Sequence, residues 1–190
     1  MYQFIQFLTY FRIISGPIIF LLILLPQNYG WALILLMLAS ATDFWDGYLA
    51  RKYSFASEYG AVLDPIADKI LITFVLIALS LCLESIYVAL ISSMMLAREF
   101  WVSALRDLNA RGGKMNATKV TFLAKIKTLV QLLTLCLFLL GLFVNSPFTI
   151  FIAKFFLFAA LIISIQTGLT YSLQTFSKLS LESIDLADRK

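Results

Sequence analysis

Three long stretches without a charged side chain limit the folds open to this chain more than any other feature. Residues 13–42, 128–153 and 155–177 run for 30, 26 and 23 positions without Asp, Glu, Lys or Arg. A membrane-spanning helix needs about 20 consecutive apolar residues. The first stretch is too long for one crossing, and a proline and a glycine interrupt it at residues 26–30, so it supplies most of two helices. The chain is therefore predicted to be an all-α integral membrane protein.

The overall composition excludes most other classes of protein. Of the 190 residues, 61% are apolar and 14% are charged, whereas soluble domains carry about 25% charged residues and disordered chains are poor in apolar ones. No histidine is present, which excludes histidine bases, histidine metal ligands and a histidine nucleophile of the phospholipase D kind. The net charge of +4 is attributed to loops that face anionic lipid, so no nucleic-acid partner is expected.

The apolar stretches and the turns between them predict six transmembrane helices in a single domain, residues 1–190. The helices are expected at residues 4–25, 31–53, 61–83, 86–109, 120–144 and 147–170, followed by a cytoplasmic tail at 171–190. The short turns at 26–30, 84–85 and 145–146 contain no Lys or Arg, whereas the other connections and the tail contain several. Because Lys and Arg concentrate on the cytoplasmic side of a membrane, both termini are predicted to be cytoplasmic.

Four aspartates near the predicted cytoplasmic ends of the second and third helices are the strongest functional signal, because ionisable residues are costly inside a membrane. One helix face, at spacings i, i+3, i+4, i+7 and i+8, collects Asp43, Asp46, Gly47, Ala50 and Arg51. A second face, with steps of about one helical turn, collects Ser57, Gly60, Asp64 and Asp68. Antiparallel neighbouring helices would bring the two faces together, and their small residues would leave room for a ligand.

Four carboxylates at one site would repel one another and take up protons unless cations compensated their charge. Oxygen ligands favour hard ions, so the cluster predicts two divalent cations, either Mg²⁺ or Mn²⁺. The competing explanation for the glycines is tight helix packing, and Asp64, which precedes Pro65, is also suited to capping a helix. Neither explanation accounts for Asp43, Asp46 and Asp68.

The spacing of these residues resembles the signature of the CDP-alcohol phosphotransferase family at every fixed position. Eight fixed residues fall within 26 positions: Asp43, Asp46, Gly47, Ala50, Arg51, Gly60, Asp64 and Asp68. Further stretches resemble the bacterial members of the family that make phosphatidylglycerophosphate, and they lie at residues 8–12, 63–69, 97–100, 103–106 and 125–128. The resemblance covers most of residues 8–131, whereas the last sixty residues carry only an apolar pattern.

This resemblance implies a membrane enzyme with six helices, a homodimeric assembly and an active site at the cytoplasmic face of the bacterial inner membrane. Such an enzyme uses two divalent metals to move a phosphatidyl group from CDP-diacylglycerol to an alcohol, and it releases CMP. Carried onto this chain, the resemblance makes Asp68 the general base, and the metal ligands would be Asp43, Asp46, Asp64 and Asp68. The residues that would contact CDP-diacylglycerol are Gln6, Thr9, Asp43, Asp46, Gly47, Ala50, Arg51, Ser57 and Gly60.

Basic residues near the inner ends of the fourth and fifth helices predict how the acceptor alcohol is bound. They are Arg98, Arg106, Lys125 and Lys127. Arg98 and Arg106 are eight positions apart and share roughly one helix face, and guanidinium groups bind phosphate through paired hydrogen bonds. Glu99 is expected to point away from Arg98 and to partner Lys125 or another base. Together with the family resemblance, these residues favour sn-glycerol 3-phosphate as the acceptor.

Other functions stay open at this point. The same chemistry with inositol phosphate, serine, glycerol or phosphatidylglycerol as acceptor is one alternative, and the dependence of the reaction on a phosphate in the acceptor would discriminate. The basic residues could also be ordinary cytoplasmic-side charges. A divalent-cation transporter also places carboxylates in a membrane, but here the acids cluster at one edge and the last two helices carry none in their apolar stretches. A membrane scaffold without catalytic activity would not need the full set of acids.

Overall fold

The computed structural model describes the backbone of residues 2–25, 27–53, 58–111 and 122–187, and the side chains of residues 7–25, 27–42, 63–110 and 126–177. Within these ranges the chain forms helices and no strand: α1 (Tyr2–Leu24), α2 (Tyr29–Tyr53), α3 (Glu58–Cys82), α4 (Ile86–Arg111), α5 (Phe122–Phe143) and α6 (Pro147–Ala187). Five of these helices contain stretches long and apolar enough to cross a membrane, and α2 contributes a shorter apolar stretch, Tyr29–Thr42. The predicted all-α membrane fold is confirmed.

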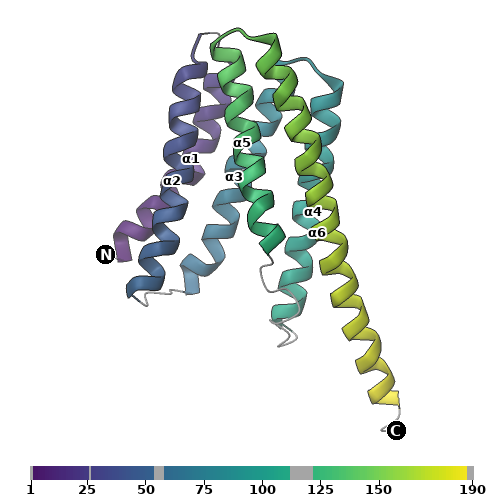
Figure 1. Ribbon diagram of the computed structural model, residues 1–190. Helices are drawn as coiled ribbons and strands as arrows, with labels where there is room; N and C mark the ends of the chain where they lie inside the picture. The colour runs from purple at the N-terminus through teal and green to yellow at the C-terminus, as the bar shows by residue number, and fades with distance from the viewer. Residues whose placement is uncertain (1, 26, 54–57, 112–121, 188–190) are drawn as a thin grey trace.

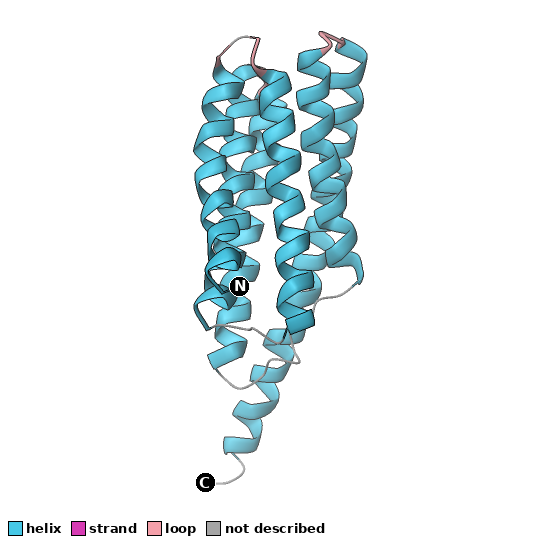
Figure 2. Ribbon diagram, turned by 90° about the vertical axis from the view of Figure 1, so that its left-hand side faces the viewer, coloured by secondary structure: helices cyan, strands magenta, loops and turns pink. Residues whose placement is uncertain are grey.

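The helices run up and down along one bundle axis, so that successive helices are antiparallel (Figure 1). The described turns after α1, α3 and α5 lie together at one end of the bundle, and both termini lie toward the other end (Figures 1 and 2). Each of these turns contains one residue in the left-handed region: Gln27 has φ 74°, Glu84 has φ 45° and Asn145 has φ 53°. A left-handed residue ends a helix and reverses the chain, which keeps these connections short.

Apolar side chains fill the interior of the bundle and also cover its outside. Members of the fully buried core include Ile19, Leu36, Leu76, Phe138 and Leu157. α1 packs along α2 and α3, α6 packs along α4 and α5, and contacts between α2 and α5 and between α3 and α4 join the two groups. Large apolar side chains such as Trp31, Phe148 and Phe155 stay exposed, as expected of helices whose outer faces meet lipid.

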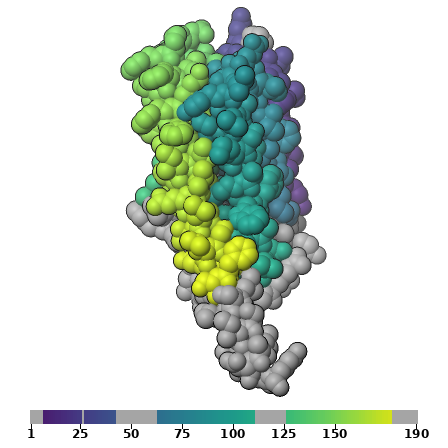
Figure 3. Space-filling model, turned by 90° about the vertical axis from the view of Figure 1, so that its right-hand side faces the viewer, coloured from purple at the N-terminus to yellow at the C-terminus, as the bar shows by residue number. Residues whose placement is uncertain are grey.

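α6 is 41 residues long and continues past residue 170, where the sequence predicts a tail. It lies side by side with α4 in the space-filling view (Figure 3). Tyr171 and Thr175 are buried, and Asn109 of α4 donates a 2.8 Å hydrogen bond to Oγ1 of Thr175. The expected helix end at residue 170 therefore differs from the structure, because polar contacts with α4 hold the next turns of α6 in place.

Candidate active site

A cavity of about 570 Å³ opens among α1, α2, α3, α4 and α5. Leu36, Leu96 and Leu135 contribute to an apolar part of its wall. The charged residues that line it are Arg12, Asp68, Lys69, Glu99, Arg106 and Lys127. Acids and bases from four helices thus meet around one cavity.

Asp64 and Asp68 lie one turn apart on α3 and face polar side chains of α1. Thr9 donates a 2.7 Å hydrogen bond from its hydroxyl to Oδ1 of Asp64. Arg12 pairs with Asp68 through Nη1, while its Nη2 lies 3.7 Å from Oδ1 of Asp64. Residues three apart on a helix share a face, so the packing of α1 along α3 places one polar face of α1 on both carboxylates.

Arg12 is a residue to which the sequence-based interpretation assigned no role. Its side chain is 0% exposed, and a buried guanidinium is unfavourable unless acids compensate its charge. Asp64 and Asp68 supply that compensation here. A signal was present, because Arg12 is the only Asp, Glu, Lys or Arg among residues 1–42, and a lone cation within a membrane helix marks a functional position.

The predicted metal ligands are described only in part. The carboxylates of Asp64 and Asp68 come together at one face of α3, and their oxygens are donors that divalent cations prefer. Asp43 and Asp46 belong to α2, but their side chains lie outside the described ones. Among the side chains that are described, no cluster of three or more acidic, histidine or cysteine residues occurs.

Of the predicted contacts to CDP-diacylglycerol, Thr9 has a described side chain, and its hydroxyl donates a hydrogen bond to Asp64. Ser57 lies outside the described residues altogether. The other predicted contacts lie in helices, at positions whose surroundings are not described: Gln6, Asp43, Asp46, Gly47, Ala50, Arg51 and Gly60. Their assignment to the nucleotide stays a prediction.

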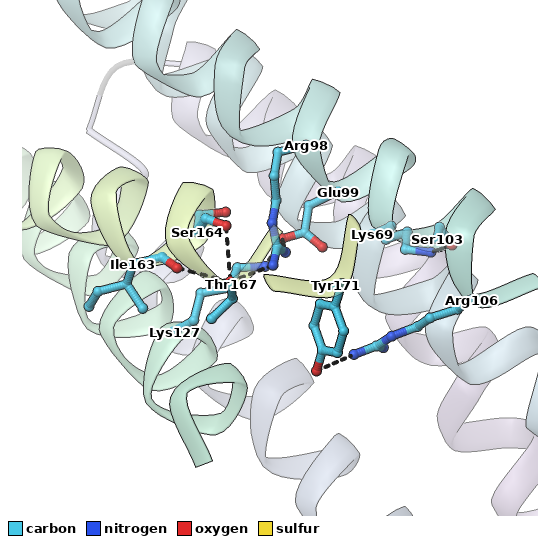
Figure 4. A network of polar contacts seen from close by, with 10 residues as sticks. All are labelled: Lys69, Arg98, Glu99, Ser103, Arg106, Lys127, Ile163, Ser164, Thr167 and Tyr171. Carbon is cyan, nitrogen blue, oxygen red and sulfur yellow. Dashed lines mark hydrogen bonds and ion pairs between the residues drawn. The ribbon is translucent and has the colours of Figure 1, made fainter. Parts of the chain in front are cut away.

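Two of the predicted acceptor residues, Arg106 and Lys127, line the cavity. Nη2 of Arg106 donates a 3.4 Å hydrogen bond to the hydroxyl of Tyr171, and the guanidinium carbon lies 5.3 Å from the centre of that ring (Figure 4). Such a stacking contact favours a cation. Lys69, which the sequence did not single out for this site, also lines the cavity and donates a hydrogen bond to Oγ of Ser103.

Arg98 turns toward α6 and is not among the residues that line the cavity. Its Nη2 donates a 2.5 Å hydrogen bond to Oγ1 of Thr167, and its Nη1 lies 3.3 Å from Oε1 of Glu99 (Figure 4). Glu99 also pairs with Lys127, whereas the side chain of Lys125 lies outside the described ones. Glu99 therefore does not point away from Arg98 as expected, because the long arginine side chain reaches back to its neighbour in sequence.

Comparisons with known proteins agree with this arrangement. The model of the CDP-alcohol phosphatidyltransferase family matches residues 5–166. A protein of Sodalis glossinidius (strain morsitans) is 36% identical over 132 residues, which cover 67% of this chain and 71% of that relative. One from Escherichia coli (strain K12) is 36% identical over 130 residues, with the same shares of the two chains. Both are named CDP-diacylglycerol–glycerol-3-phosphate 3-phosphatidyltransferase. Since the matched residues include the four aspartates and the residues around the cavity, the chain belongs to the CDP-alcohol phosphatidyltransferase family.

Proposed function

We propose that this protein transfers the phosphatidyl group of CDP-diacylglycerol to sn-glycerol 3-phosphate, which yields phosphatidylglycerophosphate and CMP. Family membership supports the class of reaction, and the relatives described above carry this activity in their names. The observation that carries the proposal is the cavity that joins Asp68 to the cations Lys69, Arg106 and Lys127. This combination suits an acceptor with a hydroxyl group to deprotonate at one end and a phosphate at the other.

The charge balance of the cavity favours an anionic acceptor. Its charged lining residues comprise four cations and two carboxylates. Lys69 and Arg106 bond to the neutral hydroxyls of Ser103 and Tyr171. These hydroxyls orient the two cations without neutralising them, so both charges remain available to a phosphate. Serine or glycerol would bring no negative phosphate to offset this excess of positive charge.

We place two divalent cations, Mg²⁺ or Mn²⁺, at the carboxylates of the signature: Asp43, Asp46, Asp64 and Asp68. The pair on α3 supports this placement, because Asp64 and Asp68 present oxygen donors one turn apart. Cations bound there would polarise the phosphoryl oxygens and stabilise the departing phosphate. The nucleotide would be held by the residues assigned to it from the family signature, with Arg51 offsetting the charge of the pyrophosphate.

Asp68 serves as the general base in this proposal, because a carboxylate can accept a proton where no histidine exists. It takes the proton of the primary hydroxyl of the acceptor, and the hydroxyl oxygen bonds to the β-phosphorus of CDP-diacylglycerol. The bond from that phosphorus to the bridging oxygen breaks, and CMP leaves with the electron pair. Arg12 contacts Asp68 from the buried side, so the base keeps one orientation toward the cavity.

We further propose one membrane domain in the bacterial inner membrane, with both termini and the cavity toward the cytoplasm. The turns at the opposite end of the bundle contain no Lys or Arg, which supports this orientation. Water-soluble glycerol 3-phosphate and CMP would then exchange with the cytoplasm directly. A homodimer is proposed on the family resemblance, and the exposed apolar helix faces are compatible with a second copy or with lipid.

Release of CMP by the purified protein, with CDP-diacylglycerol and Mg²⁺ or Mn²⁺, tests the proposed function against a panel of acceptors. Release with glycerol 3-phosphate, and not with serine, glycerol, inositol phosphate or phosphatidylglycerol, is the expected result. Release with another acceptor would retain the reaction class and overturn the acceptor. If no acceptor gave CMP while the folded protein carried metal into liposomes, the protein would be a divalent-cation transporter instead.

A further inference from the structure

Glu99 is a carboxylate in the membrane-spanning part of α4 that the proposed reaction does not use. Its side chain is 18% exposed, and it lies within the apolar span Ile86–Ala110. An acid at such a position is unfavourable unless it has a specific role or partner. Because Glu99 lines the same cavity as Asp68 and Arg106, its role is to be sought in the acceptor half of the site.

The contacts of Glu99 connect three helices (Figure 4). Its carboxylate pairs with the ammonium group of Lys127 on α5, a side chain that is 6% exposed. Its Oε1 also lies 3.3 Å from Nη1 of Arg98 on its own helix. Arg98 in turn donates a hydrogen bond of 2.5 Å to Thr167 on α6. A continuous chain of polar contacts therefore runs from α6 through α4 to the wall of the cavity on α5.

Gly168 on α6 leaves room for the side chain of Arg98. A Cβ atom placed on Gly168 would lie 3.1 Å from Nε of Arg98 and 3.2 Å from its Cγ. These distances are shorter than ordinary van der Waals contact, so the absence of a side chain at Gly168 lets the arginine lie flat against α6. Arg98 is thereby fixed at two points, and it can hold Glu99 in one position.

Lys127 needs such support because a lysine side chain is long and flexible. Its ammonium group has three donors, and one carboxylate partner leaves the others free to meet a ligand in the cavity. We propose that Glu99 is a positioning residue for acceptor binding: it holds the ammonium of Lys127 at the cavity wall, where Lys127 meets the acceptor phosphate, and Arg98 anchors Glu99 to α6. This inference rests on the proposed function, since it takes a phosphorylated acceptor as the occupant of the cavity.

A purely structural role for Glu99, as a neutraliser of two buried cations, predicts different behaviour from a positioning role. Loss of a structural acid would lower the thermal stability and the turnover with both substrates alike. Loss of a positioning acid would selectively weaken binding of the acceptor. It would have this effect only in a protein that still contains Lys127. The two roles are therefore separated by the ratio of the two KM values and by a double-mutant cycle.

The test uses the full-length protein in detergent or liposomes and compares Glu99→Gln, Lys127→Gln and the double variant. Each single variant is expected to raise the KM for glycerol 3-phosphate by about ten- to a hundredfold, the usual range when the partner that orients a binding group is lost. The KM for CDP-diacylglycerol is expected to stay within about twofold. In the double variant the acceptor KM should resemble that of Lys127→Gln alone, because Glu99 acts through Lys127.

Two further variants complete the design. Glu99→Asp keeps the charge with a shorter reach, and it should recover part of the acceptor affinity that Glu99→Gln loses. Trp101→Phe is the matched control, because it removes the 2.9 Å hydrogen bond from Trp101 to Ser172 of α6 at an exposed position outside the cavity. It should leave both KM values unchanged.

The outcomes separate the two proposals. Wild-type protein that releases no CMP with glycerol 3-phosphate would overturn the proposed function, and the role of Glu99 would fall with it. Active wild-type protein with an unchanged acceptor KM in Glu99→Gln would overturn the role of Glu99 alone, as would effects that multiply in the double variant. If Glu99→Gln did not fold, Thr167→Val would decide. It removes the hydrogen bond from Arg98 and the bonds of the Thr167 hydroxyl to the backbone of α6, and it leaves Glu99 and Lys127 in place. A selective rise in the acceptor KM supports the proposal, and an unchanged acceptor KM refutes it.

Discussion

Arg12 and Asp68 are 56 residues apart in the chain and form an ion pair between α1 and α3. The exposed fraction of the side chain is 0% for Arg12 and 41% for Asp68, so the acid is the more open partner, although both residues line the cavity. The buried guanidinium holds one side of the Asp68 carboxylate. We therefore expect Arg12 to orient the proposed base.

Arg12→Met should reduce turnover by about a hundredfold, since a misplaced catalytic group has an effect of that order. The free energy of unfolding should fall by about 1–3 kcal/mol, less than for a fully buried pair because Asp64 and Asp68 are partly exposed. CMP release and the thermal midpoint measure the two effects. Arg12→Lys retains the charge but lacks the planar guanidinium, so its turnover and stability should lie between those of the wild type and those of Arg12→Met. Near-native turnover in Arg12→Met would contradict the orienting role.

Asp68→Asn should lower turnover by about a thousandfold or more, because asparagine keeps the size of the side chain but accepts no proton, and general base catalysis is worth about 10²–10⁴. Binding of CDP-diacylglycerol should largely survive, as followed by thermal stabilisation of the protein with the nucleotide lipid. Asp107→Asn, at an exposed carboxylate on the same bundle, is the control. Wild-type rates in Asp68→Asn would exclude it as the base.

Chelation of divalent cations with EDTA should abolish CMP release, and Mg²⁺ or Mn²⁺ should restore it. Asp64→Asn should shift the metal concentration for half-maximal activity upward by about tenfold or more, because one ionised oxygen donor is lost. The titration of activity with metal measures this shift. Full activity in EDTA would rule out the proposed cations, and an unshifted titration would remove Asp64 from their ligands.

Arg106→Gln should raise the acceptor KM much more than the KM for CDP-diacylglycerol, since Arg106 lines the cavity and a guanidinium binds phosphate strongly. Tyr171→Phe removes the 3.4 Å hydrogen bond to Arg106 but keeps the ring 5.3 Å from the guanidinium carbon. Its effect should be a rise of about two- to fivefold, in line with one modest hydrogen bond. Initial rates over a matrix of both substrates measure each KM. Equal effects on the two substrates would contradict the assignment.

Gly168→Ala should weaken acceptor binding without a large loss of stability. The new methyl group would press on Arg98 at 3.1 Å from Nε, which displaces the anchor of Glu99. In the opposite direction, alanine favours a helix over glycine by about 1 kcal/mol, so the thermal midpoint should change little. Arg98→Ala should act in the same sense and more strongly. A Gly168→Ala variant with wild-type acceptor KM would show that Arg98 can shift without effect.

The fold was predictable because a membrane leaves few choices to an uncharged stretch of about 20 residues. The run from residue 128 to 153 could only be a crossing, a turn and the start of the next crossing. The proximity of Asp64 and Asp68 was predictable for a similar reason, since residues four apart on a helix must share a face.

The rotation of each helix about its axis could not be predicted in the same way. Arg98 and Arg106 occupy one face of α4 by spacing, yet Arg106 lines the cavity while Arg98 bonds to Thr167 on α6. Both arginines bond to hydroxyl groups of α6, Arg98 to Thr167 and Arg106 to Tyr171. The spacing within α4 gives no information about the positions of these hydroxyls, so the direction in which Arg98 turns, and its contact with Glu99, were not predicted.

The part of α6 that follows residue 166 lies outside the region that the family model matches. The family model ends at residue 166, whereas Thr167 and Tyr171, which accept hydrogen bonds from Arg98 and Arg106 of α4, come shortly after it. The matched region therefore includes the four signature aspartates, and it does not include the two α6 side chains that bond to Arg98 and Arg106. We expect that exchange of residues 167–175 with those of a relative would change the KM for the acceptor and leave the aspartate signature intact.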